Sequence, residues 1–426
     1  MPVSRKPPLR FSPRATVTGV AVKILVVTST FPRWPGDTDP TFVHELSRRL
    51  VDPGTEVHIL APHTAGAARR ESLDGLTVHR FRYAFERFET LAYSTGILDK
   101  LRANRLNYLL VPFFLLGMTA AAYRLVRRER YTVVHAHWLI PQGAACAAAL
   151  RFMAAPPPLV CTSHGGDLFG LRGALPGLVK RWVLARSQAV TVVSHYMREY
   201  LNATLQPRNA VAVMSMGVDL QSRFVPVDGV ARAAHDVVFV GRLVEKKGVT
   251  YLLRAIARVQ TRLPQLHVRI VGDGPLRAGL EAEATALGIT DRVTFMGAVT
   301  QDRLPALYSA AAVAVVPSVV TGSGDQEGLG LVTVEALGCG CAVIASDLPA
   351  IRDVIAPGEN GLLVPPEDVA ALADALVGML GEARAANRFQ AAARASVVDR
   401  FDWEATAARY RALLQDAARA RAASER

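Results

Sequence analysis

The chain has 426 residues, of which half are hydrophobic and a fifth are charged, and its formal net charge is +12. This length exceeds one hydrophobic core and predicts two domains, while the composition excludes a disordered protein. Four cysteines lie in apolar runs without any C-x-x-C spacing: Cys146, Cys161, Cys339 and Cys341. They indicate buried thiols of a reduced, cytoplasmic protein and argue against a cysteine metal site or a disulfide framework.

The positive charge is concentrated in the first half of the chain. Residues 1–225 contain 28 Lys and Arg against 14 Asp and Glu, whereas residues 226–426 contain 21 against 23. This excess indicates an anionic partner, such as a lipid surface or an acidic substrate, or simply an Arg-rich composition with solvated faces. Both interpretations stay open.

Residues 1–21 predict a flexible extension without a secretory signal, because their basic residues are not followed by a sufficient apolar run. Nearly all-apolar runs, typical of parallel strands covered on both faces, then alternate with helical patterns. The first series predicts strands at residues 22–28, 56–61, 132–136, 159–163, 189–193 and 210–214, and helices near 40–51, 141–153 and 175–187.

The pattern lapses over residues 215–235 and then restarts. The second series predicts strands at residues 236–241, 267–272, 293–297, 313–317, 341–346 and 361–365. Two such series predict an α/β protein with two doubly wound, Rossmann-like lobes, residues 22–220 and 221–400, that face a central cleft. Residues 401–426 are expected to form a C-terminal helix that crosses back to the first lobe.

Residues 106–123 contain no charge and are flanked by arginines on both sides. Their length is barely enough to span a bilayer, and Asn107, Pro112 and Gly117 interrupt them. The segment favours a buried or surface-docked helix over a membrane span. If it touches lipid, we expect it to lie in the interface.

Two motifs of the second series come after strands, where open α/β sheets bind their ligands; the first directly follows strand 236–241, and the second follows strand 313–317 after a loop. Gly241 and Arg242 begin the turn G-R-L-V-E-K-K-G, in which Lys247 is a further cation, and this arrangement suits a diphosphate. The stretch E-G-L-G-L-V-T-V-E runs from Glu327 to Glu335 in an otherwise core-like segment. We expect one helix that starts at Glu327 and carries both acids, rotated by about 80° from each other. They would either hold hydroxyls of an extended ligand or be ordinary helix acids.

With these motifs the sequence resembles glycosyltransferase family 4 over roughly residues 22–415. The glutamate pair occurs with V-G-D-G-P (271–275), F-M-G-A-V (295–299) and G-E-N-G-L-L-V-P (358–365) in the order usual for the family. The resemblance implies a GT-B fold and a retaining enzyme that moves a hexose-type sugar from a UDP- or GDP-type nucleotide sugar to an acceptor hydroxyl. It implies no required cofactor and no metal, and we expect no nucleic-acid partner.

The same resemblance assigns the donor site. Arg242 and Lys247 would bind the diphosphate, Glu335 the ribose hydroxyls and Glu327 the transferred sugar. Three backbone amides would lie near sugar and phosphate, those of Gly328, Leu329 and Gly330.

Other donor contacts are implied from neighbouring loops. The base would lie against backbone near Gly272–Asp273 and Ala298–Val299, and Gly241 would also belong to the donor site. In the first lobe, the loop after the first strand would bring Gly36 and Asp37 toward the sugar and phosphate.

The acceptor side is expected in the first lobe. His164 matches the active-site histidine that family members place near the reacting carbon of the sugar, with Asp167 as its partner. His135 and His137 have the H-x-H spacing of a metal site, but no third ligand is evident, so we favour acceptor-pocket lining. The acceptor is expected to be a glycan or lipid-linked molecule of the cell envelope, reached in the cytoplasm with peripheral contact to an anionic membrane.

Other classes of protein fit less well. A nicotinamide-dependent dehydrogenase would need G-x-G-x-x-G after its first strand, whereas V-G-D-G-P-L-R-A-G follows an internal strand and lacks that spacing. A two-lobed solute-binding protein would need a signal peptide. A GT-B phosphorylase or epimerase, and a member that binds nucleotide sugar without turnover, stay as alternatives.

Overall fold

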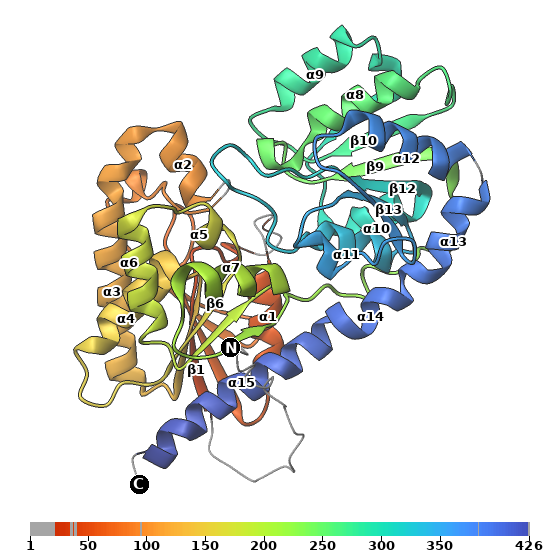
Figure 1. Cartoon of the computed structure of the whole chain (residues 1–426). Coiled ribbons are helices and arrows are strands. Elements are labelled where there is room, and N and C mark those ends of the chain that lie inside the picture. The colour runs from red at the N-terminus through yellow and green to blue at the C-terminus, as the bar shows by residue number, and fades with distance from the viewer. Residues whose placement is uncertain (1–21, 35–36, 38–40, 94–95, 382, 425–426) are drawn as a thin grey trace, which may run out of the picture.

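The computed structural model describes residues 22–34, 37, 41–93, 96–381 and 383–424, and it forms two α/β lobes (Figure 1). The extension expected at residues 1–21 lies outside the described residues. Each lobe has its own parallel sheet between helices, as the alternation of apolar runs and helical patterns predicts.

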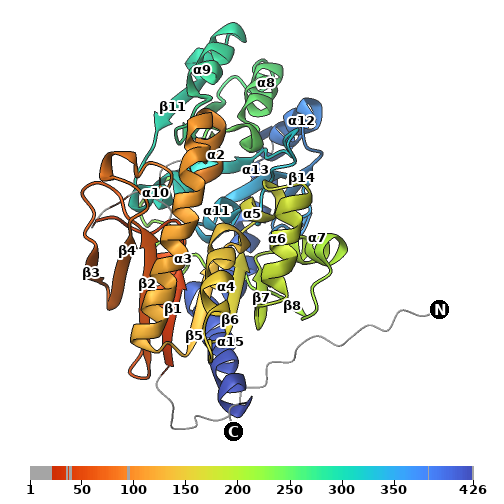
Figure 2. The ribbon, with the colours of Figure 1, turned by 90° about the vertical axis from the view of Figure 1, so that its left-hand side faces the viewer.

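The first sheet has the strand order β3-β4-β2-β1-β5-β6-β7-β8, and all its neighbouring strands are parallel except β3 and β4. The six expected strands are present as β1 (Val22–Val27), β2 (Thr55–Pro62), β5 (Val133–His137), β6 (Leu159–Ser163), β7 (Ala189–Val192) and β8 (Val211–Val213). The helices of this lobe are α1 (Phe42–Leu50), α2 (Ile97–Ala103), α3 (Leu110–Glu129), α4 (Ala144–Arg151), α5 (Gly166–Phe169), α6 (Ala174–Leu184) and α7 (His195–Leu205). Helices α3, α4 and α6 lie together on one face of the sheet, which is turned toward the viewer in Figure 2.

Two strands of this sheet were not predicted, β3 (Arg70–Leu73) and β4 (Leu76–Phe81). They form an antiparallel hairpin around Asp74 and Gly75, whose φ angles are 50° and 79°. An Asp-Gly pair with two positive φ angles is the usual signature of a tight hairpin turn, so the signal was present in the sequence. The strands were missed because polar residues alternate along them, unlike the continuous apolar runs of the sheet centre.

The second sheet has the order β11-β10-β9-β12-β13-β14 and is parallel throughout its described pairs. Its strands are β9 (Ala233–Val240), β10 (His267–Val271), β11 (Val293–Gly297), β12 (Ala311–Val316), β13 (Ala342–Ser346) and β14 (Gly361–Val364). Its helices are α8 (Val249–Val259), α9 (Arg277–Ala286), α10 (Leu304–Ala310), α11 (Leu331–Gly338), α12 (Val369–Gly381) and α13 (Ala383–Ala393). All six expected strands are present, so the prediction of two doubly wound lobes is confirmed.

The chain returns to the first lobe through α14 (Ala395–Phe401) and α15 (Trp403–Ser424), which runs along that lobe in Figure 1. The Tyr410 hydroxyl donates to the carbonyl of Met214 at 3.0 Å, and the Arg49 guanidinium lies 5.4 Å from the Trp403 ring centre. The α15 segment therefore packs on the first lobe with its aromatic side chains.

The uncharged segment 106–123 forms the short helix η2 (Arg105–Leu109) and most of α3. On its inner side, Phe114, Met118, Ala122 and Val126 are buried. Gly117 packs so closely that an added methyl group would lie 2.7 Å from the carbonyl oxygen of Arg82. The segment is thus a helix docked on the sheet, in agreement with the interpretation favoured from the sequence.

We expect Gly217→Ala to destabilise the protein by about 1–3 kcal/mol, the usual cost of overpacking. The added methyl group would lie 2.5 Å from ring atoms of Trp403, where α14 and α15 meet the linker. Gly378→Ala is the matched control, because Gly378 lies in α12 with open space around it and should gain slightly from helix propensity. Urea denaturation of both variants measures the effect, and equal stabilities would contradict the packing argument.

Candidate active site

Two loops meet at the carboxyl edge of the second sheet. The first follows β9 and contains Arg242, the short helix η4 (Glu245–Lys247) and Gly248. Gly248 has a φ of 63°, and an added methyl group would lie 1.9 Å from the carbonyl oxygen of Pro317, in the loop after β12. Only glycine fits there, because the backbone is left-handed and touches the other loop. This contact brings the predicted diphosphate loop against the segment that carries Glu327.

A buried ion pair joins these two loops. The Nζ atom of Lys247 lies 2.8 Å from Oε1 of Glu327, and the two side chains are 13% and 11% exposed. Burial alone would raise the pKa of Glu327, but the charge of Lys247 and its neighbour Lys246 outweighs burial and lowers it. The carboxylate is therefore ionised, and its counter-ion comes from a residue eighty positions earlier in the chain.

The second acid occupies a different environment. Helix α11 begins at Leu331, so Glu327 lies in the preceding loop and the expectation that both acids share one helix was wrong. The reason is Gly330, whose left-handed φ of 82° separates loop from helix. On α11, Glu335 accepts a hydrogen bond from the Tyr308 hydroxyl at 3.3 Å. Burial raises the pKa of Glu335 to about 7, against the smaller opposing effects of Tyr308 and Lys247.

Contacts between the lobes close the cleft next to these acids. Arg242 forms a 3.0 Å ion pair with Asp99 of α2, and the guanidinium of Arg172 donates to the carbonyl of Gly324 at 3.2 Å. The residue Gly328 fits against the first lobe so tightly that an added methyl group would lie 2.7 Å from the carbonyl oxygen of His164. The segment of the second lobe that is predicted to bind the donor thus faces the predicted catalytic histidine. We call the second lobe, in which that donor site is predicted, the donor lobe.

A group of histidines ends β5 and follows β6 in the first lobe. The Nδ1 atom of His137 lies 2.9 Å from Nε2 of His164, and the His164 ring also packs near Phe42 and Trp138. Burial lowers the pKa of His164 to about 3, so its imidazole is neutral at physiological pH. His135 is fully buried next to His137 and hydrogen-bonds to Thr162 at 2.8 Å. Across the described part of the chain, these histidines do not gather with acids or cysteines into a group of three suited to a metal.

Two predicted carboxylates have local partners. Asp167 is buried, and it accepts hydrogen bonds from the backbone of Leu139 at 2.6 Å and from the Ser163 hydroxyl at 2.7 Å. Asp37 accepts two hydrogen bonds of 2.7 Å from the Arg33 side chain. Both acids therefore have hydrogen-bond partners within the first lobe, and neither set of contacts was recognised from the sequence. Gly36 lies outside the described residues.

The loops predicted to hold the base also lie at the carboxyl edge of the second sheet. The carbonyl of Asp273 accepts from the backbone of Leu243 at 2.9 Å, which places the loop after β10 next to that of Gly241. Val299 follows β11 and is partly buried. Sequence reasoning missed Asp99, Arg172 and Tyr308, which contact the predicted site from elements distant in the chain.

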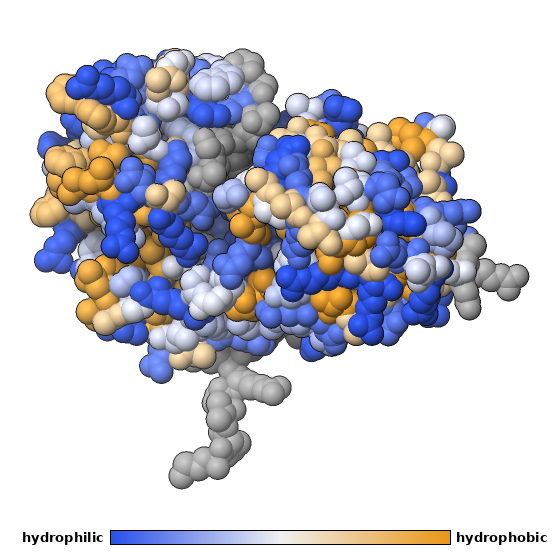
Figure 3. Space-filling view, turned by 90° about the horizontal axis from the view of Figure 1, so that it is seen from above, coloured by the Kyte–Doolittle hydropathy of each residue, from blue (hydrophilic) through white to orange (hydrophobic). Residues whose placement is uncertain are grey.

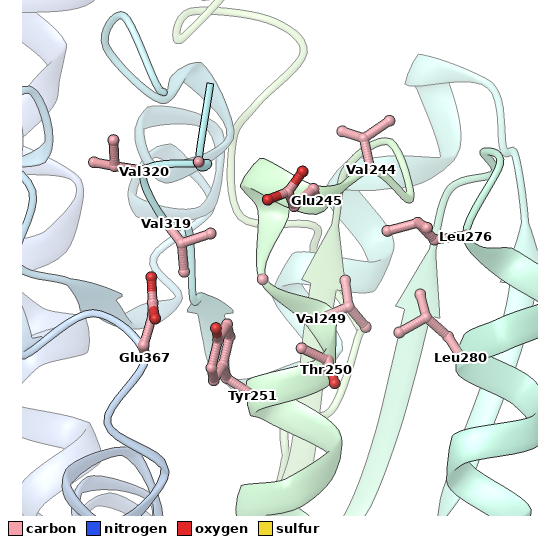
Figure 4. Close-up of a pocket in the computed structure, with 12 residues that line it drawn as sticks. Val244, Glu245, Val249, Thr250, Tyr251, Leu276, Leu280, Val319, Val320 and Glu367 are labelled. Atoms are coloured by element: carbon pink, nitrogen blue, oxygen red, sulfur yellow. The ribbon is translucent and has the colours of Figure 1, made fainter. Parts of the chain in front are cut away.

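A separate pocket of about 340 Å³ lies between η4, the start of α8 and the loop after β12 (Figure 4). Its lining includes Val244, Glu245, Tyr251, Leu276 and Glu367. None of the predicted site residues lines this pocket, so the pocket is separate from the predicted donor site in the cleft between the lobes.

Comparison with known proteins agrees with this geometry. Residues 40–222 match the family model described as Glycosyltransferase Family 4, and residues 234–382 match the model described as Glycosyl transferases group 1. The D-inositol 3-phosphate glycosyltransferase of Frankia alni is 31% identical over 399 residues, which are 86% of this chain and 91% of that protein. The chain belongs to glycosyltransferase family 4.

Other proteins similar to this family 4 enzyme are also glycosyltransferases or share its fold. The GDP-mannose-dependent alpha-(1-6)-phosphatidylinositol monomannoside mannosyltransferase of Mycolicibacterium smegmatis is 31% identical over 62% of this chain and 72% of its own length. Among solved structures, sucrose-phosphate synthase from Thermosynechococcus elongatus has a TM-score of 0.76 at 24% identity, over 93% of this chain and 98% of that one. Anabaena HepE in complex with UDP has a TM-score of 0.70 at 18% identity, over 93% and 100%. At such identities these structures show the GT-B fold, and the family shows that the chain is a glycosyltransferase.

The contact between Gly328 and His164 can be tested directly in this glycosyltransferase. Gly328→Ala should hold the lobes apart, because the added methyl group would overlap the His164 carbonyl oxygen. We expect a larger radius of gyration by small-angle X-ray scattering and a loss of activity of tenfold or more, since misplacement by about 1 Å is costly in catalysis. Gly322→Ala, in the same loop with open space around Gly322, is the control. A compact, fully active Gly328→Ala protein would refute the role of this contact.

The buried histidines predict acid sensitivity. Burial lowers the pKa of His135 to about 3, below the value of 6.5 in the unfolded chain. Between these values the unfolded state binds a proton that the folded state does not, so stability falls as the pH falls below 6.5. The loss is about 1.4 kcal/mol per pH unit for each such histidine. His135→Gln should flatten the pH dependence of urea unfolding between pH 6.5 and 5, and an unchanged slope would count against the burial argument.

Proposed function

We propose that this family 4 enzyme is a retaining hexosyltransferase that uses a nucleotide-diphosphate sugar of the UDP or GDP type. The observation that carries the proposal is the meeting of Arg242, Lys247, Glu327 and Glu335 at one sheet edge, opposite His164. Cations there suit a diphosphate, and carboxylates suit the hydroxyls of a ribose and a sugar. Relatives add support, since one mannosyltransferase is GDP-mannose-dependent and HepE was crystallised with UDP-glucose.

In the proposed reaction the bond between the anomeric carbon and the diphosphate oxygen breaks, and a bond to the acceptor oxygen forms on the same face. The acceptor proton passes to the leaving phosphate. Negative charge grows on the diphosphate, where Arg242 and Lys247 stabilise it. We propose that no metal or other cofactor is required, because these side chains supply the positive charge.

The two acids have separate proposed roles. Glu327, ionised beside Lys247, anchors hydroxyls of the transferred sugar. Glu335 binds the ribose hydroxyls from α11, and the amides of Gly328, Leu329 and Gly330 lie between the two acids in the chain. His164 is neutral and approaches the sugar from the first lobe as a hydrogen-bonding group. The ring of His137 positions it through the 2.9 Å hydrogen bond.

The proposed acceptor is a hydroxyl of a glycan or of a lipid-linked saccharide, in the synthesis of envelope polysaccharide, glycolipid or a related glycoconjugate. The reaction is placed in the cytoplasm, at the cytoplasmic face of a membrane. One relative supports a lipid-linked acceptor, because its name includes phosphatidylinositol monomannoside. Another is named for D-inositol 3-phosphate, which carries no lipid, so the acceptor hydroxyl is the feature that the two have in common.

A nucleotide-sugar panel tests the proposal. Thermal shift and calorimetry with UDP- and GDP-sugars identify the donor, and nuclear magnetic resonance of the product reports the anomeric configuration. Arg242→Ala should lower kcat/KM by about 10²–10³, the usual loss for one charge-stabilising donor. Arg262→Ala, an exposed arginine elsewhere on the donor lobe, is the matched control. Inverted product would refute retention, and an unaffected Arg242→Ala enzyme would refute the diphosphate assignment.

The raised pKa of Glu335 predicts pH-dependent donor binding. Ribose hydroxyls donate to an ionised carboxylate, and Glu335 is half protonated near pH 7 in the ligand-free protein. Affinity for a nucleotide sugar should therefore rise from pH 6 to pH 8, by up to about tenfold per unit below 7. Glu335→Gln should bind more weakly and lose this dependence, whereas Glu359→Gln, an exposed acid of the same lobe, should keep it. A pH dependence that survives in Glu335→Gln would contradict the ribose assignment.

A further inference from the structure

The outer side of η2 and α3 exposes a row of large hydrophobic side chains. We call Leu106, Leu109, Phe113 and Leu116 the apolar stripe; they are 70%, 69%, 59% and 67% exposed. Their spacing of three, four and three residues places them on one side of the helical segment. A stripe of this kind on an otherwise soluble fold marks an interaction surface.

The helix cannot leave the lobe to cross a membrane without unfolding it. Residues 105–129 are long and apolar enough for a span by length and composition. Yet Phe114 and Met118 on the opposite side of α3 are buried against the sheet, and Gly117 contacts the carbonyl of Arg82. The apolar stripe therefore faces outward, because the opposite side of α3 is packed on the sheet.

Basic side chains continue the same surface. Along α3 the exposed row changes from Phe113 and Leu116 to Arg124 and Arg127, which lie on the same side two to three turns further on. The whole segment of residues 97–187 contains twelve Lys and Arg against three Asp and Glu. Of these side chains, Asp167 and Lys180 are buried inside the lobe. The remaining side chains of the segment are therefore mainly basic, and Arg124 and Arg127 place positive charge directly beside the apolar stripe.

Further hydrophobic residues lie on the same face of the lobe. Helix α6 exposes Leu175 and Leu178, at 72% and 60%, and α3 and α6 both face the viewer in Figure 2. Seen from above, hydrophobic side chains gather along the left-hand edge of the molecule, the side of α2 and α3 (Figure 3). The surface extends beyond a single helix, as docking on a plane requires.

We propose that this face binds an anionic lipid surface, with the apolar stripe inserted at the level of the headgroups and the arginines of α3 paired with lipid phosphates. The charge complementarity favours lipid over a second copy of this chain, whose equally basic face would repel it. Apolar side chains that enter the acyl boundary and arginines that reach headgroups are the two parts of an interfacial helix. The binding itself does not depend on the proposed reaction.

Vesicle co-sedimentation tests the inference with the full chain. The wild-type protein should sediment with vesicles of phosphatidylcholine containing about 30% phosphatidylglycerol, and much less with pure phosphatidylcholine. Leu109→Ser/Phe113→Ser/Leu116→Ser should weaken binding at least about tenfold, because each change removes an inserted apolar side chain. Arg124→Gln and Arg127→Gln should each weaken it about fivefold, a loss that disappears at high salt.

Matched controls separate lipid docking from misfolding and from self-association. Leu276→Ser and Arg262→Gln replace exposed residues of the donor lobe and should bind vesicles as the wild type does. The apolar triple variant should keep its melting temperature, which shows that it is folded. It should also keep its affinity for a soluble nucleotide sugar, because the donor site is tested by that affinity and the lipid surface by vesicle binding. Unchanged vesicle binding by the triple variant would overturn the inference. So would a wild-type dimer in gel filtration that the triple variant abolishes.

Discussion

The donor side of this enzyme depends on one constraint, the burial of charge where two loops meet. Glu327 could not remain ionised in this position without a cation, and Lys247 reaches it at 2.8 Å because Gly248 lets the loop after β9 touch the loop after β12. Removing one partner of such a buried pair usually costs ~3–5 kcal/mol, since the other charge is left uncompensated. The pair therefore fixes the relative position of both loops before any donor binds. The proposed diphosphate-sugar donor would meet a lysine and a carboxylate that are already in place, with little reorganisation left to the reaction itself.

The sequence predicted the central strands because parallel strands buried on both faces must be apolar throughout, and this pattern survives without any tertiary information. The sequence-based prediction failed where contacts between distant residues determine where a helix begins or which side chains pair. The start of α11 depends on the left-handed backbone of Gly330, and a glycine-rich stretch does not reveal which glycine carries it. The pairing of Arg242 with Asp99 joins residues 143 positions apart, which spacing along a chain does not report. Asp167 illustrates the same limit, because a carboxylate that follows a strand can face the cleft or turn inward, and here Leu139 and Ser163 hold it inside.

Closure of the cleft combines one contact that a ligand can replace with one that a ligand cannot. The ion pair of Arg242 and Asp99 is exposed enough to be weak, so a diphosphate with more negative charge can take over the guanidinium. The contact of Gly328 with the His164 carbonyl is different, because it is steric and needs no ligand. It defines how near the lobes approach. The steric contact of Gly328 thus fixes the closed geometry, and the ion pair with Asp99 holds Arg242 at the cleft until a ligand replaces Asp99. Each contact joins one residue of the first lobe to one residue of the second.

The apolar stripe directly follows, along the chain, the helix that contributes Asp99 to the cleft. Helix α2 carries Asp99, which touches the donor lobe, and it passes through Asn104 directly into η2, where the stripe begins at Leu106. A surface that binds the stripe would therefore also fix the position of α2 at the cleft entrance. The second lobe could still contact α2 there through the ion pair of Arg242 with Asp99. For the proposed lipid-linked acceptor this geometry matters, because the lobe that would contact the headgroups is also the lobe that carries His164. In the proposed reaction the lipid surface would confine the acceptor to a plane and the apolar stripe would orient the enzyme on that plane, which reduces the rotational freedom lost when both substrates meet.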